Sequence, residues 1–312
     1  MPNLNHVAKR LIQLVPTLFL VLVVIFVLVR LLPGDPTSAM LGDRATDADV
    51  ARLNAQLGLD RSIPAQFLLF VERIAQGDLG TSIHLKVPVM QLILERMPVT
   101  LALTGYAALL ALILAVPLAF AAAMRRGRAA DTAIRGAFQI GLSMPIFYLG
   151  LVLLTVFAAG LRWFPVGGYG DDWGDRMWHL FLPALTLALS LSAVLMRNLR
   201  ASIIEVLGAE YVDFARSKGL APRLVLGRHV LRNALISTVT LFGLSVGTLI
   251  GGAVITETVF AIPGAGRLMI DSIYGRDYPV VQGLTLAMAV LVSLVFLATD
   301  LVQAALDPRV KA

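Results

Sequence analysis

Long apolar runs are the feature that most limits what this chain can fold into. A run of about 20 apolar residues matches the roughly 30 Å thickness of the hydrocarbon core of a bilayer. Within that core a backbone must satisfy its own hydrogen bonds, so each run is predicted to be a helix. The runs predict an all-α membrane protein with six transmembrane helices, at residues 11–32, 99–124, 136–160, 180–196, 234–255 and 284–306.

The composition supports this fold class. Hydrophobic residues occupy 58% of the 312 positions and charged residues 15%, whereas a soluble domain has about 25% charged residues. The sequence contains no cysteine, which excludes disulfides and cysteine nucleophiles. Its four histidines are scattered, so we predict no metal site and no cofactor bound by this chain itself. Because basic residues of membrane chains gather in cytoplasmic loops, the net charge of +6 does not lead us to expect a nucleic-acid partner.

The basic residues fall on alternate joins between the predicted spans. Lys9 and Arg10 precede the first span, arginines cluster at 125–135 between the second and third, and basic residues cluster again at 197–232 between the fourth and fifth. The positive-inside rule therefore predicts a multi-pass membrane protein with both termini cytoplasmic. The joins at 33–97 and 161–179 are then external.

The first external join has the pattern of a small helical region. Thr46 and Asp49 form a capping-box pattern, and Ser62 and Pro64 mark the start of a second helix that Gly77 ends. The chain then divides into an N-terminal end with the first span (1–32), this external helical region (33–97), a membrane core (98–306) that includes the cytoplasmic loop 197–232, and a cytoplasmic tail (307–312).

The predicted spans lack the groups that an ion-driven carrier uses. Spans one to five contain no ionisable residue through their cores, and the sixth contains Asp300 only near its inner end. Carriers driven by protons or ions usually need such groups inside the membrane. The sequence also lacks a Gly-x-x-x-x-Gly-Lys-Ser/Thr phosphate loop, so energy from ATP would have to come from a partner.

One short pattern, "GLSVG" at 243–247, matches the Gly-x-Ser-x-Gly nucleophile elbow of hydrolases. The elbow requires a strand-turn-helix setting and a histidine base, whereas Ser245 lies in an apolar span. We interpret Gly243, Gly247 and Gly251 as a small-residue seam that allows close helix packing. An intramembrane hydrolase remains an alternative function of another class.

The loop at 197–232 is patterned like two short helices. In "EYVDFARSKGLAPRLVLGRHVLRNAL", Gly219 can adopt the left-handed conformation that ends a helix, and Pro222 suits the first turn of the next one. The positive-inside rule explains the arginines of this loop but not its order of helix, glycine, proline and helix. A shaped element protruding from the membrane predicts a docking site for a cytoplasmic protein.

At these residues the chain resembles the membrane subunits of ATP-binding-cassette (ABC) importers. Their signature loop has Glu-Ala-Ala, three residues, Gly, nine residues and Ile-x-Leu-Pro. Residues 213–215, "DFA", stand for Glu-Ala-Ala and Gly219 for the glycine, while His229 and Leu231 stand for Ile-x-Leu. Arg232 departs from the pattern where proline is usual.

Further segments in order resemble the dipeptide, oligopeptide and nickel branch of these permeases. They are "RLLPGDP" from Arg30, "LGLDRSIPAQF" from Leu57, "GDLGTSI" from Gly77, "ETVFAIPGAGRL" from Glu257, "RDYPVVQG" from Arg276 and "ALDPR" from Ala305. The resemblance implies the type I ABC importer transmembrane fold. It also implies a permease subunit of the cell's inner membrane, not itself an enzyme, that forms half of the translocation pathway for di- or oligopeptides.

The resemblance further implies partners and site residues. The partners would be a homologous second permease, two ABC ATPase subunits that bind ATP and Mg²⁺, and an extracytoplasmic substrate-binding protein. We assign the ATPase contact to Asp213, Phe214, Ala215, Arg216, Lys218 and Gly219. Candidates for a polar path lining are Thr186, Ser190, Asn233, Thr238 and Thr240, with interhelical hydrogen bonding as the alternative role for each. Nickel, glutathione or another small solute is the alternative substrate, and a structural scaffold is a further class.

Overall fold

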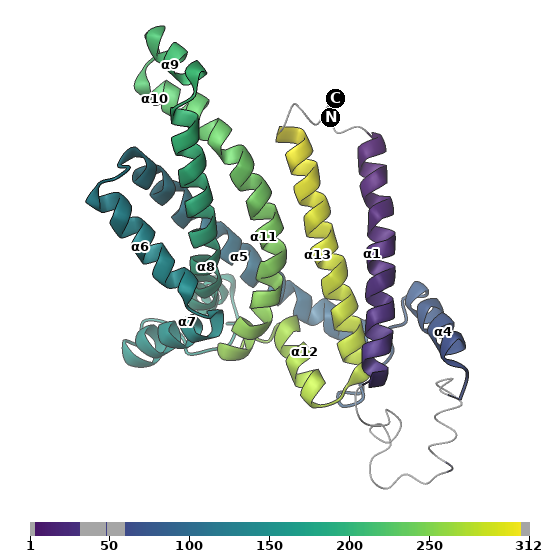
Figure 1. Ribbon diagram of the computed structural model, residues 1–312. Coiled ribbons are helices and arrows are strands. Elements are labelled where there is room, and N and C mark those ends of the chain that lie inside the picture. The colour runs from purple at the N-terminus through teal and green to yellow at the C-terminus, as the bar shows by residue number, and fades with distance from the viewer. Residues whose placement is uncertain (1–3, 32–47, 49–59, 307–312) are drawn as a thin grey trace.

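The computed structural model describes residues 4–31, 48 and 60–306, and the regular structure of these residues is helical (Figure 1). The α-helices are α1 (Leu4–Leu31), α4 (Ile63–Ala75), α5 (Val89–Met124), α6 (Ala129–Ser143), α7 (Ile146–Leu153), α8 (Trp173–Leu207), α9 (Glu210–Ser217), α10 (Pro222–Leu224), α11 (Arg232–Val259), α12 (Ala265–Tyr274) and α13 (Tyr278–Leu306). Two π-helical turns, η1 (Leu154–Gly160) and η2 (Val225–Leu231), continue α7 and lead into α11.

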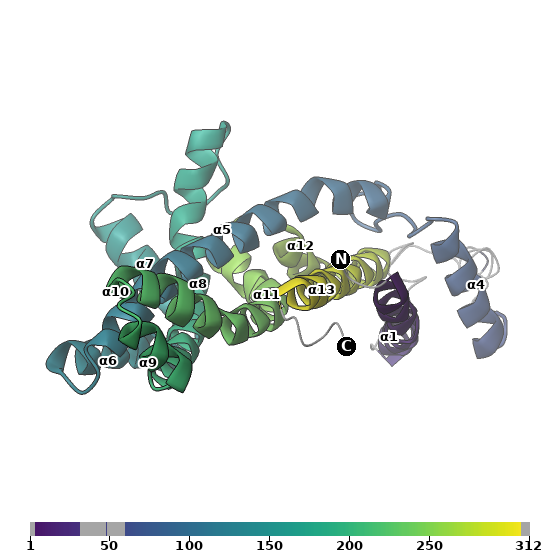
Figure 2. The same cartoon turned by 90° about the horizontal axis from the view of Figure 1, so that it is seen from above.

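The long helices form a bundle in which α5 and α8 make the most extensive contact. Small side chains line this contact, because Ala107, Ala111 and Ala115 of α5 and Ala184 and Ala188 of α8 are all completely buried. Small residues let two helix backbones approach closely, which increases van der Waals contact where no water is present to drive association. α11 packs on α8, α13 packs on α11, and α1 lies along α13 (Figures 1 and 2).

Most of the predicted spans correspond to helices, although the helices extend beyond them. Four segments are long and apolar enough to cross a membrane: Val89–Met124, Trp173–Leu207, Pro222–Val259 and Tyr278–Gln303. They contain the second, fourth and fifth predicted spans and most of the sixth, which ends with α13 at Leu306. The first predicted span overlaps α1. α5 starts at Val89, ten positions before the predicted second span.

The third predicted span, 136–160, is not one straight helix. The chain bends by 106° between α6 and the α7–η1 segment. Met144, which precedes Pro145, has φ −88° and ψ 134°, the extended conformation that a following proline favours by clashing with a helical neighbour. The apolar run conceals this break because Met144 and Pro145 interrupt the helix without interrupting the hydrophobicity.

The region that was predicted to be external is described at residue 48 and from residue 60 onward. α4 begins at Ile63, with Ser62 as its N-cap residue and Pro64 in its first turn, and Gly77, just beyond the end of α4, has φ +78°. Phe67 of α4 packs edge-on against Phe19 and Phe26 of α1. The predicted capping box at Thr46–Asp49 and the tail at 307–312 lie outside the described residues.

Two of the family-like segments contact one another at the end of the bundle where α12 lies. Asp277 precedes α13, and its carboxylate accepts hydrogen bonds from the Ser82 hydroxyl (2.5 Å) and the His84 backbone N–H (3.2 Å). A Cβ at Gly283 would collide with the side chain of Val89, so α13 and the start of α5 approach closely. The "GDLGTSI" segment is therefore anchored to the "RDYPVVQG" segment.

A buried carboxylate lies near the same end. α11 continues past the predicted limit of residue 255 to Val259 and so includes Glu257, which has no exposed surface. The Glu257 carboxylate accepts hydrogen bonds from the Thr100 hydroxyl (2.6 Å) and the Arg267 backbone N–H (3.0 Å). It joins α5, α11 and the first turn of α12. The sequence analysis missed this group because its predicted fifth span stopped two positions earlier.

Candidate functional site

A short helical element projects from one end of the bundle (Figure 1). It consists of α9 and α10, which are joined by residues 218–221. The beginning of α1 and the end of α13 lie at this same end, while α12 lies at the opposite one (Figure 1). The predicted loop 197–232 is thus mostly helical: its first part is the last turns of α8, and its last part is η2.

α9 has one face toward the bundle and one toward the surroundings. Val212 and Ala215, three positions apart, are buried, whereas Asp213, Phe214 and Arg216 are exposed. This is the pattern of an amphipathic helix held by a narrow apolar stripe. Of the six residues assigned to the partner contact, Ala215 therefore packs inward, and the other five lie at the surface.

The exposed face of this element is unusually apolar for a polar end of a membrane protein. Phe214 is 62% exposed, and Tyr211, Leu220 and Leu224 are also exposed. The Lys218 ammonium lies 4.6 Å from the centre of the Phe214 ring, and Arg216 forms an ion pair with Asp213 at 3.3 Å. Apolar side chains grouped among charges on an exposed face are typical of a protein-interaction site.

Gly219 sets the bend between α9 and α10. Its φ is +75°, in the left-handed region that the helix-glycine-proline pattern predicts. The backbone N–H of Gly219 donates to Arg216 (2.9 Å), and the N–H of Leu220 donates to Ala215 (3.4 Å), which closes α9. No heavy atom lies within 4 Å of a Cβ placed at Gly219, so the requirement for glycine comes from the backbone conformation rather than from crowding.

Hydrogen bonds connect this element to α11. The Asn233 side-chain amide donates to the Tyr211 hydroxyl on α9 (3.0 Å) and to the His229 carbonyl (2.8 Å). Asn233, which was predicted to line a path, thus contacts the projecting element, and its predicted path-lining role stays a prediction. Sequence reasoning missed Tyr211, which has no signal of its own there.

A second group of polar contacts joins the adjacent ends of α8 and α11. The Asn198 amide donates to Thr238 (3.3 Å), and the hydroxyls of Ser202 and Ser237 are 2.8 Å apart. Asn198 and Ser202 are four positions apart on α8, and the spacing of Asn233 and Ser237 on α11 is the same. That spacing places each pair on one helical face and could have indicated a polar contact from the sequence.

The predicted path-lining residues do not converge on one cavity. Thr186 and Thr238 are buried within the chain, and the Thr186 hydroxyl bonds to the Leu182 carbonyl of its own helix (2.8 Å). Ser190 and Thr240 are half-buried. Thr238 takes part in the interhelical bonding that was its alternative role, through Asn198 of α8, whereas the Thr186 bond lies within α8.

The glycines of α11 contact different neighbours. A Cβ at Gly243 would collide with Thr299 of α13, and one at Gly247 would lie 2.8 Å from the Phe296 ring. No atom lies within 4 Å of a Cβ at Gly251, whereas Gly252 faces Leu187 of α8 at 3.0 Å. Ser245 is in the middle of α11, a setting unlike the turn of a nucleophile elbow. Among the residues that the structure describes, no three His, Asp or Glu side chains converge as a metal site.

We expect the Tyr211–Asn233 bond to hold α9 in place. Replacing Tyr211 with phenylalanine or Asn233 with leucine should each raise the rate of limited proteolysis within residues 208–224 about five-fold, since one such bond contributes about 1 kcal/mol. The double variant should be cleaved no faster than the more rapidly cleaved single variant. Thr240→Val is the control, because the Thr240 hydroxyl bonds only to Ile236 of its own helix. Fully additive effects would show that the two side chains act independently.

Two family profiles match this chain, and together they cover most of it. The profile of the family described as "Binding-protein-dependent transport system inner membrane component" matches residues 115–312, and the profile of its N-terminal region matches residues 3–104. The chain is 40% identical to the di/tripeptide transport system permease protein DppB of Pseudomonas aeruginosa, over 99% of both chains. It is 39% identical to the glutathione transport system permease protein GsiC of Salmonella typhimurium, also over 99% of both.

Solved structures show the same fold. A chain of the inward-facing methionine ABC transporter MetNI matches with a TM-score of 0.59 and 18% identity, covering 70% of this chain and 97% of that one. A chain of an amino acid ABC transporter matches with a TM-score of 0.52 and 14% identity, covering 70% of this chain and 94% of that one. These neighbours are importer membrane subunits, so the predicted type I importer fold is confirmed.

Proposed function

Because the chain belongs to the family of binding-protein-dependent transport system inner membrane components, we propose that this ABC importer permease carries di- and tripeptides. The observation that carries the substrate class is 40% identity, over 99% of both chains, to a permease named for di- and tripeptides. Glutathione, itself a tripeptide, is the second candidate, because GsiC permeases are similar to this chain over the same length. The relatives reported above are named for peptides or glutathione, which favours peptides over nickel.

The permease subunit is a transport component and not an enzyme. Family membership implies ATPase and substrate-binding partners in general. We propose the specific assembly as this chain with one homologous permease, two ABC ATPases that bind ATP and Mg²⁺, and one extracytoplasmic binding protein. A charged peptide could not cross the hydrocarbon core unaided, since even one charge at the bilayer centre costs upwards of about 2.5 kcal/mol.

The projecting α9–α10 element is the proposed ATPase contact. Its exposed residues Asp213, Phe214, Arg216, Lys218 and Gly219 would touch the ATPase, while buried Ala215 would hold α9 against the bundle. Asn233 would link the contact to α11. This assignment puts α9–α10 and both termini in the cytoplasm, in agreement with the arginine clusters at 125–135 and 197–232.

Transport by the reconstituted complex tests the proposal. The chain, its second permease, the ATPases and the binding protein are placed in proteoliposomes, and uptake of labelled dialanine, trialanine, glutathione and Ni²⁺ is measured with and without ATP. We expect ATP-dependent uptake of dialanine and trialanine, and no uptake by the permease alone under a proton gradient. Uptake of glutathione alone would establish the second candidate, and uptake of Ni²⁺ alone would overturn the peptide proposal.

A further inference from the structure

A cavity of about 350 Å³ lies between α6 and α8, and none of its lining residues belongs to α9 or α10. It is lined by Thr132, Arg135, Gly136, Phe138, Gln139 and Leu142 of α6 and by Ala193, Met196, Arg197 and Arg200 of α8. The α8 members follow a spacing of three, four and seven positions, so they share one helical face. α6 begins, and α8 ends, at the end of the bundle that carries α9 and α10 (Figures 1 and 2).

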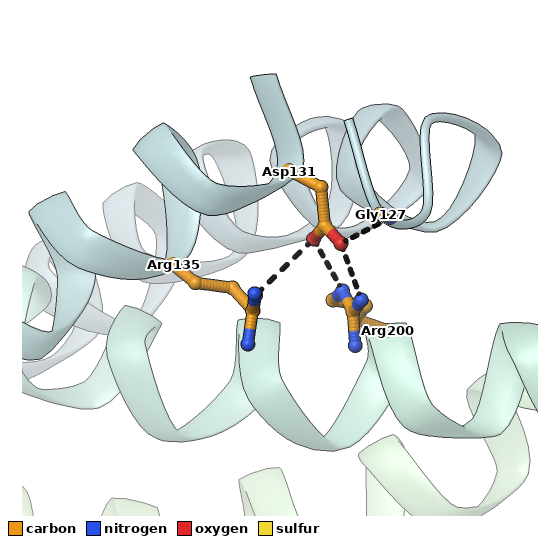
Figure 3. A network of polar contacts seen from close by, with 4 residues as sticks. All are labelled: Gly127, Asp131, Arg135 and Arg200. Atoms are coloured by element: carbon orange, nitrogen blue, oxygen red, sulfur yellow. Dashed lines mark hydrogen bonds and ion pairs between the residues drawn. The ribbon is translucent and has the colours of Figure 1, made fainter. Parts of the chain in front are cut away.

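The cavity is rich in positive charge. Figure 3 shows Asp131 between two arginines: Arg200 donates to the carboxylate through Nε (2.7 Å) and Nη2 (2.6 Å), and the Arg135 Nε lies 3.4 Å from it. The Gly127 backbone N–H donates a further hydrogen bond to Asp131 (3.0 Å). Arg197 is exposed and forms no ion pair with any residue in the described part of the chain. The cavity lining thus carries three guanidinium groups, of which Arg135 and Arg200 share the single carboxylate of Asp131, so positive charge is in local excess.

The opposite end of the cavity is mainly apolar, with Gln139 as the one polar side chain among the lining residues beyond Arg135 on α6. Phe138 and Leu142 lie further along α6 than Arg135, and Ala193 and Met196 lie before Arg197 on the antiparallel α8, so these apolar side chains share the deeper end. Seven residues of helix separate Ala193 from Arg200, about 10 Å along the axis. An occupant that fits must have an anionic group at one end and a hydrocarbon chain at the other. Phospholipids of the surrounding bilayer have this chemistry.

We propose that the α6–α8 cavity binds an anionic phospholipid. Arg135 and Arg197 hold its headgroup phosphate, and the start of one acyl chain lies along Phe138 and Met196. Basic pockets between transmembrane helices near a membrane surface are suited to such headgroups, because each arginine contributes attraction while the helices supply the apolar wall. Asp131 orients Arg135 and Arg200 so that both can face the same pocket. The inference does not depend on which solute the permease carries.

Lipid titration of the full-length permease in detergent tests the site, with labelled phosphatidylglycerol as the probe and phosphatidylcholine as the neutral lipid. Arg135→Gln and Arg197→Gln should each weaken phosphatidylglycerol binding about five-fold, and the pair about thirty-fold. Gly136→Trp should also weaken binding, because a Cβ there meets no atom within 4 Å and the ring can fill the cavity without moving the backbone. Arg200 is left intact, since its loss would strand the buried Asp131.

Arg223→Gln is the matched control, because Arg223 is an exposed arginine on α10 outside the cavity. It should bind phosphatidylglycerol like the wild type, and phosphatidylcholine should bind weakly to every form. Wild-type binding by both Arg197→Gln and Gly136→Trp would overturn the proposal. So would displacement of the lipid by inorganic phosphate alone, which indicates a simple anion site. Loss of the lipid on assembly with the second permease would show that the cavity is instead a subunit contact.

Discussion

Replacing Glu257 with alanine should lower the unfolding free energy of the permease by about 3 kcal/mol. Each buried donor left without an acceptor costs about 1–3 kcal/mol, and Glu257 is the acceptor for two of them, the Thr100 hydroxyl and the Arg267 backbone N–H. The Thr100 hydroxyl in turn accepts a hydrogen bond from the Ala265 N–H (2.9 Å). Loss of the carboxylate therefore disturbs the first turn of α12 at two points.

The position of this carboxylate also explains the glycines of the "ETVFAIPGAGRL" segment. A Cβ at Gly264 would collide with the Glu257 carboxylate, and a Cβ at Gly266 would come within 3.0 Å of its Oε2 atom. The carboxylate can thus lie against the N-terminal turn of α12, where the helix dipole favours a negative charge. We expect Gly266→Ala to be destabilising as well, since the Val254 backbone lies 2.5 Å from the added Cβ.

Unfolding by sodium dodecyl sulfate in mixed micelles, followed by helical signal, measures these losses. Glu257→Gln keeps the shape of the side chain and one acceptor oxygen, so it should lower the unfolding free energy less than Glu257→Ala does. Glu95→Ala is the control, because Glu95 is exposed on α5 and accepts a hydrogen bond from Gln91 one turn earlier in the same helix (2.8 Å). If Glu257→Ala and Glu95→Ala unfold at the same detergent fraction, Glu257 does not stabilise the α5–α11–α12 junction.

The sequence predicted the membrane helices well because hydrophobicity is a local signal. It did not predict the contacts between them, because those join distant positions: Asp131 binds Arg200 across 69 positions and Glu257 binds Thr100 across 157. The 106° bend at Met144–Pro145 was missed for a different reason. The sequence shows the proline, but an apolar run does not indicate whether a proline is accommodated within a helix or ends it. Pro117 lies inside the continuous α5, whereas Pro145 follows the end of α6.

The candidate site was predictable where backbone chemistry dictates the structure. Gly219 and Pro222 define the α9–α10 bend through residue type alone, and φ of +75° at Gly219 agrees with that prediction. The sequence did not show which side of α9 faces outward. Ala215 has a place in the family-like signature, yet it packs inward with Val212. The contact of Asn233 with Tyr211 requires α9 to fold back toward α11, and no local pattern contains that information.

Replacing Gly219 with valine should uncouple the importer while leaving the permease in the membrane. A side chain at positive φ costs roughly 1–2 kcal/mol, and more when it is β-branched. Nothing within 4 Å of the Cβ position opposes a change of shape, so the bend should relax to another conformation rather than unfold the bundle. That relaxation moves Phe214 relative to Leu224 and changes the proposed docking face. We expect about ten-fold weaker ATPase binding, the equivalent of about 1.4 kcal/mol, with loss of substrate-stimulated hydrolysis.

Two control variants distinguish an effect of the changed α9–α10 bend from an effect of an added side chain or of backbone strain elsewhere in the chain. Ala221 has φ −57° and ψ 136°, an extended conformation that valine adopts readily, so Ala221→Val adds the same side chain nearby without strain. Gly77 has φ +78° and open space around its Cβ position, so Gly77→Val imposes the same strain near α4, at the other end of the bundle. Both variants should retain ATPase co-purification and substrate-stimulated hydrolysis. If Gly219→Val also retains them, the α9–α10 bend is not the ATPase contact; if Gly77→Val loses them equally, strain anywhere in the chain is sufficient and the effect does not locate the contact at α9–α10.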